Sequence, residues 1–250
     1  MNWRLRLEKE MGPFLDDKAL IGKIDHKGQL DFGDSVHNCM TRIICLLILE
    51  GRQDHVISEY EYYCSQFQLI PGVWIRNPNK DSWVSDPDKT SRDAMTPIAC
   101  ALALFSDIIR ANWLTERHRE RWYLFAQGSG QQHEEKVKGK INKRRDPTLF
   151  EFNGLLKRGR GERGLLLYLA DFEMLLGVVW REYFNYDNDI RNYALTLMIS
   201  KLKGRTFIGD IARWLVDKDW LIKKIDRWWG QRAGEPPIHI HFKDAVARVL

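Results

Sequence analysis

Polar side chains with catalytic potential gather just before, or at the start of, two apolar stretches of the sequence. Asp31 and Asp34 flank a Phe-Gly pair, and His37 follows within one helical turn. Arg92 and Asp93 stand at the start of the second apolar stretch. Glycosidic cleavage needs two carboxylates in different environments, one protonated and one ionised. We therefore identify Asp34 and Asp93 as the candidate catalytic carboxylates.

The residues near the two carboxylates suit a sugar ligand, because an aromatic ring can cover the apolar face of a sugar. Five residues are expected to bind substrate: Asp31, His37, Arg92, Trp74 and Trp83. A carboxylate at a helix N-terminus tends to stay ionised. Asp34 and Asp93 therefore fit the role of base, nucleophile or clamp better than that of general acid, and the sequence identifies no general acid.

Helix capping is the competing explanation for these acids. Asp, Asn and Ser are favoured N-cap residues, because their side-chain oxygens accept hydrogen bonds from the unpaired N–H groups of the first turn. Ser35 and Ser91 are the expected caps of the two apolar helices. Capping explains one acid per helix but not the additional Asp31, His37 and Arg92. If capping is their only role, the chain is a structural or interaction protein, for example a phage virion component.

Other site chemistries have weaker support. Asp31, Asp34 and His37 offer ligands to a hard metal ion, but their spacing matches no established metal signature, and we expect neither a metal nor another cofactor. The sequence contains no G-x-x-x-x-G-K-[ST] phosphate loop and no G-x-S-x-G nucleophile motif. The four cysteines form no C-x-x-C pair, so we expect them to be buried thiols in a reducing compartment.

The charge balance allows a third function, nucleic-acid binding. The chain carries a formal net charge of +5, and many of its bases lie in the stretch 136–163. A basic surface can meet an anionic polymer. Aromatic residues are not interleaved with these bases as a stacking platform requires, so a solvated loop and helix end is the favoured interpretation.

No segment of the sequence resembles a membrane span or a signal peptide. The longest apolar runs, 43–49 and 98–105, are much shorter than the ~20 residues that cross a bilayer. The first twelve residues are charged throughout and lack an apolar core. We therefore expect a cytoplasmic location, or a virion location if the chain is phage-encoded.

The elements that must position the candidate residues are mostly helices. Apolar residues at i, i+3, i+4 and i+7 predict helices over 35–50 and 92–111. Further helices are predicted over these ranges: 54–67, 116–126, 148–157, 164–183, 189–202, 207–216, 217–229 and 242–249. Residues 1–33 and 70–91 are expected to be irregular, and 127–147 to be a flexible basic insertion. Only 238–242 alternates like a strand.

The order of these helices predicts an all-α array of helical hairpins in a single domain, residues 1–250. Apolar helices that follow an acidic lead are succeeded by more polar helices, as expected for buried inner and exposed outer members of hairpins. If the inner helices run in the same direction, their acidic leads meet at one end of the array. The glycan site is expected at that end.

Three motifs resemble those of a family of uncharacterised bacterial and phage-encoded helical proteins. The motifs are Gly33-Asp34-Ser35-Val36-His37, Trp83-Val84-Ser85-Asp86-Pro87, and Ser91 to Pro97. The ending Ala233 to Ile238 is also similar to a G-x-P-P ending in that group. More distantly, the acid-led hairpins resemble the (α/α) toroid of many glycoside hydrolases and polysaccharide lyases. That resemblance implies a partial toroid, since the chain is short for a closed ring.

Overall fold

The computed structural model describes residues 2–78, 92–120, 218–230 and 234–250, and single positions or short runs between 191 and 202. The helices of these parts are α1 (Trp3–Met11), α2 (Ser35–Glu50), α3 (Asp54–Phe67), α4 (Arg92–Phe105), α5 (Ile108–Glu120), α11 (Lys218–Gly230) and α12 (Ile238–Val249), with the short 3-10 helix η1 (Gly12–Phe14). Two antiparallel pairs accompany them: β1 (Lys23–Ile24) with β2 (Leu30–Asp31), and β3 (Gln68–Ile70) with β4 (Val73–Trp74). The all-α prediction is therefore confirmed for the described residues.

Several predictions concern segments outside the described residues. They include the loop that carries Trp83, the insertion at 127–147, the helices predicted over 148–183 and 207–216, and the basic stretch 136–163. The described positions between 191 and 202 are helical, as predicted for 189–202. Within the described chain, no helix is long and apolar enough to cross a membrane.

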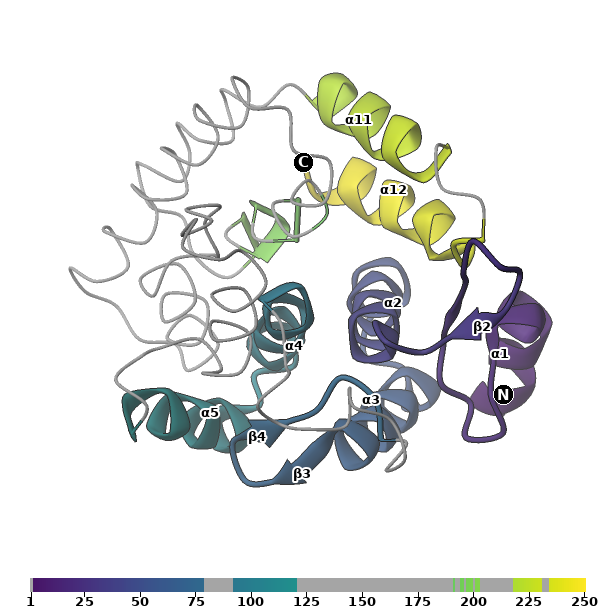
Figure 1. Ribbon diagram of the computed structural model, residues 1–250. Helices are drawn as coiled ribbons and strands as arrows, with labels where there is room; N and C mark the ends of the chain where they lie inside the picture. The colour runs from purple at the N-terminus through teal and green to yellow at the C-terminus, as the bar shows by residue number, and fades with distance from the viewer. Residues whose placement is uncertain are drawn as a thin grey trace, which may run out of the picture.

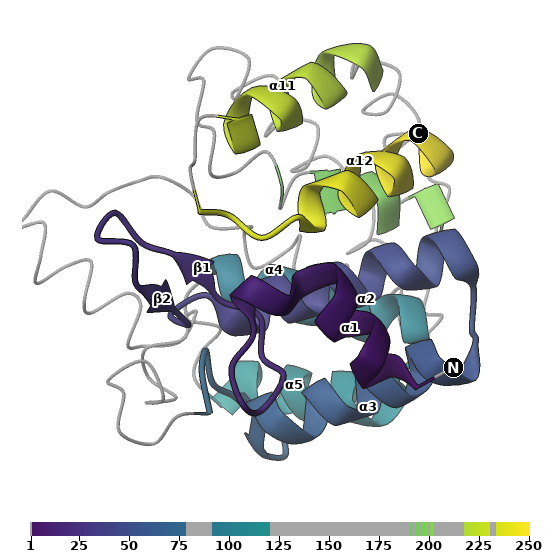
Figure 2. The ribbon, with the colours of Figure 1, turned by 90° about the vertical axis from the view of Figure 1, so that its right-hand side faces the viewer.

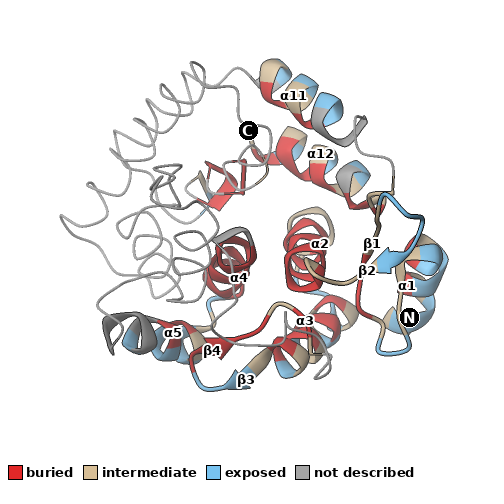
Figure 3. Ribbon diagram, in the orientation of Figure 1, coloured by how far each residue is buried: buried red, intermediate tan, exposed pale blue. Residues whose placement is uncertain are grey.

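Helices α2 and α4 form the centre of the described structure (Figure 1). Helix α2 packs against α3, α4 and α12, and twelve of its sixteen residues are buried. Such burial favours apolar residues, which predominate in both helices, although α2 also buries five polar side chains. Figure 3 shows the contrast with α3 and α5, whose outer faces are exposed.

Consecutive helices pack as pairs. Helix α3 packs on α2, α5 on α4, and α11 on α12. In each pair one member lies toward the middle and the other outside it (Figure 1). Helix α3 buries Val56, Tyr60, Tyr63 and Phe67, which follow a helical spacing, and exposes its other side. An inner helix is followed by an outer one in α2–α3 and α4–α5, whereas in α11–α12 the outer helix comes first (Figure 1).

The inner helices α2, α4 and α12 run in the same direction. At their C-terminal ends, Arg52 donates a hydrogen bond to the carbonyl of Phe105, and Arg248 donates one to the carbonyl of Leu49 at 2.7 Å. Helix α2 packs against both other helices, and Figure 2 shows α12 lying alongside it. Because their C-terminal ends meet, their N-terminal ends, with Asp34 at the start of α2, also gather at one end.

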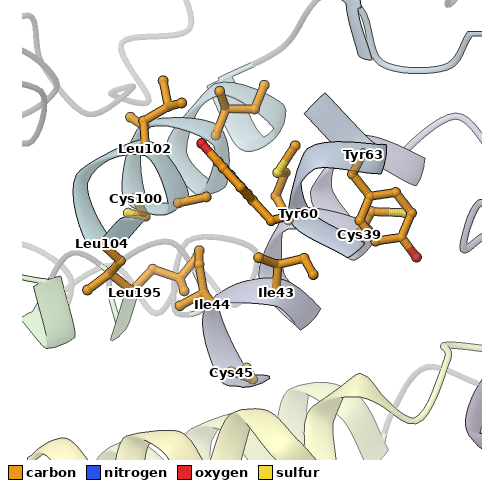
Figure 4. Close-up of a cluster of buried hydrophobic side chains, with 14 of the residues drawn as sticks. Cys39, Ile43, Ile44, Cys45, Tyr60, Tyr63, Cys100, Leu102, Leu104 and Leu195 are labelled. Atoms are coloured by element: carbon orange, nitrogen blue, oxygen red, sulfur yellow. The ribbon is translucent and has the colours of Figure 1, made fainter. Parts of the chain in front are cut away.

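The core between the helices is apolar and contains all four cysteines. Figure 4 shows Cys39, Cys45 and Cys100 among aliphatic side chains and the rings of Tyr60 and Tyr63. All four thiols, including Cys64, are buried and form no disulfide. Burial raises the pKa of both Cys39 and Cys64 to about 12. The prediction of buried thiols is confirmed, and these two thiols remain protonated and poorly nucleophilic at neutral pH.

The prediction of irregular structure before residue 34 is wrong for α1. Asn2 caps this helix by accepting a hydrogen bond from Arg4 N–H at 3.0 Å. Arg6 and Glu10 pair one turn apart at 2.8 Å. Only Leu7 and Met11 of the helix are buried. The apolar stripe is therefore too narrow to appear as a periodic pattern, although the cap and ion pair stabilise the helix.

The predicted helix 92–111 is in fact two helices. The chain breaks after Phe105, where Ser106 adopts a left-handed conformation with φ of 54°. Asp107 then caps the start of α5, because its Oδ1 accepts a hydrogen bond from Arg110 N–H at 3.1 Å. The Ser-Asp pair at 106–107 is a capping signal that lies within an otherwise continuous apolar pattern.

The strand predicted over 238–242 is also wrong, because these residues open α12. Two prolines precede Ile238, and Pro237 is the N-cap residue. Ile238 and Phe242 are both buried and lie one turn apart on the helix face that packs on the core. Ile240 points outward. The alternation of five residues was shorter than the helical stripe that continues through Ala245, Val246 and Val249.

Candidate functional site

Asp34 occupies the N-cap position of α2, but its side chain does not cap the helix. Its Oδ1 instead accepts a hydrogen bond from Arg76 Nη2 at 2.5 Å, and its Oδ2 accepts one from Lys23 Nζ at 2.7 Å. Ser35, the predicted cap, is the first residue of the helix and is fully buried. The capping explanation therefore fails for the side chains of both Asp34 and Ser35.

Backbone groups take over the cap of α2. Val36 N–H donates to the carbonyl of Arg76 at 3.1 Å, and Ser35 N–H donates to the carbonyl of Phe32 at 3.0 Å. Arg76 follows β4, so this hairpin holds the start of α2 by one main-chain bond and one ion pair. Asp34 is thereby left with its charge directed toward two cations rather than toward the helix.

Electrostatics keep Asp34 ionised. Partial burial opposes its charge, but Lys23 and Arg76 outweigh burial and lower its pKa well below the usual range. Lys23 shows the complementary effect: burial opposes its charge, and the carboxylates around it, Asp34 foremost, still raise its pKa. The Asp34 side chain is 34 % exposed, so a fixed anion remains accessible at the surface. It is not a general acid.

Asp31 is the second acid of this cluster and belongs to β2. Its Oδ1 accepts a hydrogen bond from Gly33 N–H at 2.8 Å, and its Oδ2 lies 3.9 Å from Lys23 Nζ. The side chain is 45 % exposed. Asp31 therefore orders the turn that leads to Asp34, and it presents a second carboxylate to solvent beside the same lysine.

His37 and Trp74 do not line a surface in this structure. Their exposed fractions are 1 % and 2 %, and Trp74 is part of the hydrophobic core. A sugar ring needs an accessible aromatic face, and Trp74 presents none. We therefore withdraw the sugar-stacking role predicted for Trp74 and the direct substrate contact predicted for His37.

The second candidate carboxylate is placed by its backbone alone. Arg92 and Asp93 are the first two residues of α4, and their side chains lie outside the described residues, as does Trp83. Helices α2 and α4 run in the same direction, so the main chain of Asp93 lies at the same end of the helices as Asp34. The starts of α2 and α4 therefore lie at one end of the described helices.

Two members of the cluster carry no strong sequence signal. Lys23 stands in a short strand, and Glu235 lies close enough to Lys23 to raise its pKa. Ile24 N–H donates to the carbonyl of Gly234 at 2.7 Å. Gly234 has φ of +91°, and a Cβ there would lie 2.2 Å from the Ile24 carbonyl oxygen, so this contact requires glycine. In the sequence, only the Gly-Glu-Pro-Pro motif drew attention to this segment. Its position beside Lys23 is apparent only in the fold.

The cluster does not form a metal centre. Within the described parts of the chain, no group of three His, Cys, Asp or Glu side chains could hold a metal ion, and Asp31, Asp34 and His37 belong to those parts. Two cations already occupy both oxygens of Asp34. The arrangement suits recognition of polar groups: it offers carboxylates as hydrogen-bond acceptors and cations as donors.

Comparison of the chain with known family models, curated proteins and solved structures found no match.

Proposed function

We propose that the chain is a carbohydrate-active protein, a glycoside hydrolase, that binds a polysaccharide at the N-terminal end of its inner helices. The observation that carries the proposal is the state of Asp34. This carboxylate is ionised, one-third exposed and not used as a helix cap. Its position at the end where α2 and α4 begin is the one expected of a partial (α/α) toroid.

The proposal gives each described residue a distinct role. Asp34 accepts hydrogen bonds from sugar hydroxyls, because its low pKa keeps it unprotonated. The same low pKa makes it a weak general base, so its proposed role is to hold the substrate. Lys23 and Arg76 hold its two oxygens in place. Asp31, exposed beside Lys23, contacts the same ligand from the neighbouring turn. Asp93, at the start of α4, is the second carboxylate of the site.

Glycan binding and reducing-sugar release test this proposal. The informative variants are Asp34→Asn and Asp93→Asn, with Asp17→Asn as the matched control, because Asp17 is exposed and lies outside the cluster. We expect Asp17→Asn to behave as wild type and the other two to lose binding or release at least tenfold, about 1.4 kcal/mol. Absence of binding by the wild-type chain on a broad glycan array would refute the proposal.

A structural or assembly role is the second candidate function, and one observation favours it. Both oxygens of Asp34 are already paired with cations from two other elements, β1 and the segment after β4. In that case the cluster fastens the two hairpins to the start of α2, and Asp34→Asn lowers stability without affecting any ligand. Thermal melts of the same three variants therefore separate the two candidates.

A further inference from the structure

A pocket lies at the opposite ends of the inner helices, beside the residues where these helices end. This pocket of about 560 Å³ is bounded by the last turns of α2 and α4, the end of α12 and residues 201–202. Helix α2 is about 24 Å long, so the pocket is one helix length from Asp34. Its volume lies within the range of roughly 300–1,000 Å³ typical of small-molecule sites.

The wall of the pocket is aliphatic. Leu47 and Leu104 line it from α2 and α4, and Leu202 lines it with nearly half of its side chain exposed. Among the described residues, the lining contains no aromatic side chain and no carboxylate. Such a surface favours the burial of a flexible hydrocarbon chain over that of a planar ring or a polar sugar.

Three cations stand in the same lining: Arg52, Lys201 and Arg248. Arg52 and Arg248 are exposed, which places them at the mouth of the pocket. Each donates one hydrogen bond to a main-chain carbonyl at a helix end, Arg52 to Phe105 and Arg248 to Leu49. These bonds fix the direction of both guanidinium groups.

The hydrogen bonds to the helix ends use only part of the charge and only some of the N–H donors of Arg52 and Arg248. A helix end carries about −0.5 of an elementary charge, whereas each guanidinium carries a full positive charge and five N–H donors. Neither arginine forms an ion pair with a carboxylate of the described residues. Positive charge and unused donors therefore remain at the mouth of an aliphatic pocket.

We propose that this pocket binds an amphiphile that has an aliphatic chain and an anionic head, either a carboxylate or a phosphate. The chain lies against Leu47, Leu104 and Leu202. The head lies at the mouth, where Arg52 and Arg248 donate charge-assisted hydrogen bonds to its oxygens. This site is independent of the glycan site.

Calorimetric titration with three ligands of equal chain length tests the chemistry of the pocket. Decanoate and decyl phosphate carry an anionic head, and decanol does not. We expect at least one of the anions to bind about tenfold or more tightly than decanol, because the neutral hydroxyl of decanol cannot form charged hydrogen bonds with the two arginines. Equal affinity for all three ligands, or no binding of either anion at about 1 mM, overturns the proposal.

Matched variants locate the binding in this pocket. Arg52→Met and Arg248→Met keep an aliphatic side chain, and Arg227→Met removes an exposed arginine of α11 as control. Leu202→Glu puts a negative charge in the pocket. Because Leu202 is exposed, this substitution leaves the packing of the core unchanged. Leu69→Glu is its control at an exposed position of β3. We expect the three pocket variants to weaken anion binding about tenfold and the controls to bind as wild type. Pocket variants indistinguishable from their controls overturn the proposal.

Discussion

Helix α2 carries an arginine–carboxylate cluster at its start and another in its middle, and the two differ chiefly in exposure. At the start, Asp34 pairs with Lys23 and Arg76 and keeps one-third of its surface in solvent. In the middle, fully buried Arg42 donates to Glu59 at 2.8 Å and also pairs with Glu10. The same chemistry thus appears once where a ligand can reach it and once, in the Arg42–Glu59 pair, where both side chains are buried by protein.

The difference indicates which cluster serves the fold. Arg42 joins α2 to α3 through Glu59 and to α1 through Glu10. A buried charge that loses its partner is strongly destabilising, because the remaining charge stays without water. The exposed cluster at Asp34 has water as an alternative partner, so its ion pairs contribute less to stability. It is correspondingly easier to recruit for binding.

The largest expected effect is at Arg42. Arg42→Met leaves buried Glu59 without its cation, and we expect a loss of about 3–5 kcal/mol in the free energy of unfolding. Urea unfolding measures this loss. The double variant Arg42→Met with Glu59→Leu removes both charges and should recover much of it. If Arg42→Met lowers the free energy of unfolding no more than Asp34→Asn does, the proposed difference between the two clusters is wrong.

An intermediate effect is expected at Glu50, where α1 meets the end of α2. Arg6 and His55 hydrogen-bond its carboxylate, the Arg6 bond being the larger cause, and the pKa falls from 4.5 to about 2. A pKa lowered by folding stabilises the protein above the unfolded value and loses this contribution as pH falls from 4.5 toward 2. We expect Glu50→Gln to cost about 1–2 kcal/mol at pH 7 and much less near pH 2. An equal cost at both pH values would contradict this assignment.

The smallest effect is expected at Asp34. Asn is nearly isosteric with Asp, but it removes the charge and replaces one of the two acceptor oxygens by an NH2 donor. Because water can reach this side chain, Asp34→Asn should cost about 1 kcal/mol, or roughly 2–4 °C in melting temperature. Asp17→Asn should stay within about 0.5 kcal/mol of wild type. A fall of 4 °C or more without any change in glycan binding favours the assembly role. A loss of binding at unchanged melting temperature favours the site.

Periodicity predicted several of the amphipathic and apolar helices well. The limits of α2 and α3 agree with prediction, and α11 agrees to within one residue. It failed for α1, whose buried stripe has two residues, and for the start of α12, where five alternating residues resembled a strand. It also missed the break at Ser106, because a capping pair interrupted the pattern without introducing a polar run. Local signals are weakest where tertiary contacts or a single cap decide the structure.

The candidate site was predicted only in part. The acidic residues before the apolar helices were evident from their types, and so was the possibility that they share one end. Residue types could not show that Asp34 pairs with Lys23 and Arg76, because these residues are 11 and 42 positions away in the chain. They also could not distinguish a core tryptophan from a ligand platform. Trp74 is an aromatic residue in either case, and only the packing around it buries its ring.

The sequence by itself determined that the described parts of the chain are mostly helical, and it indicated that α2 and α4 lie inside, because apolar residues predominate in both helices. It also determined that α2 and α4 begin with an excess of acids. Tertiary structure alone decided the partners of those acids, since the approach of β1, β4 and the 234–237 turn to one helix start depends on how the whole chain packs. The same packing decided that Asp34 is a fixed, exposed anion rather than a cap.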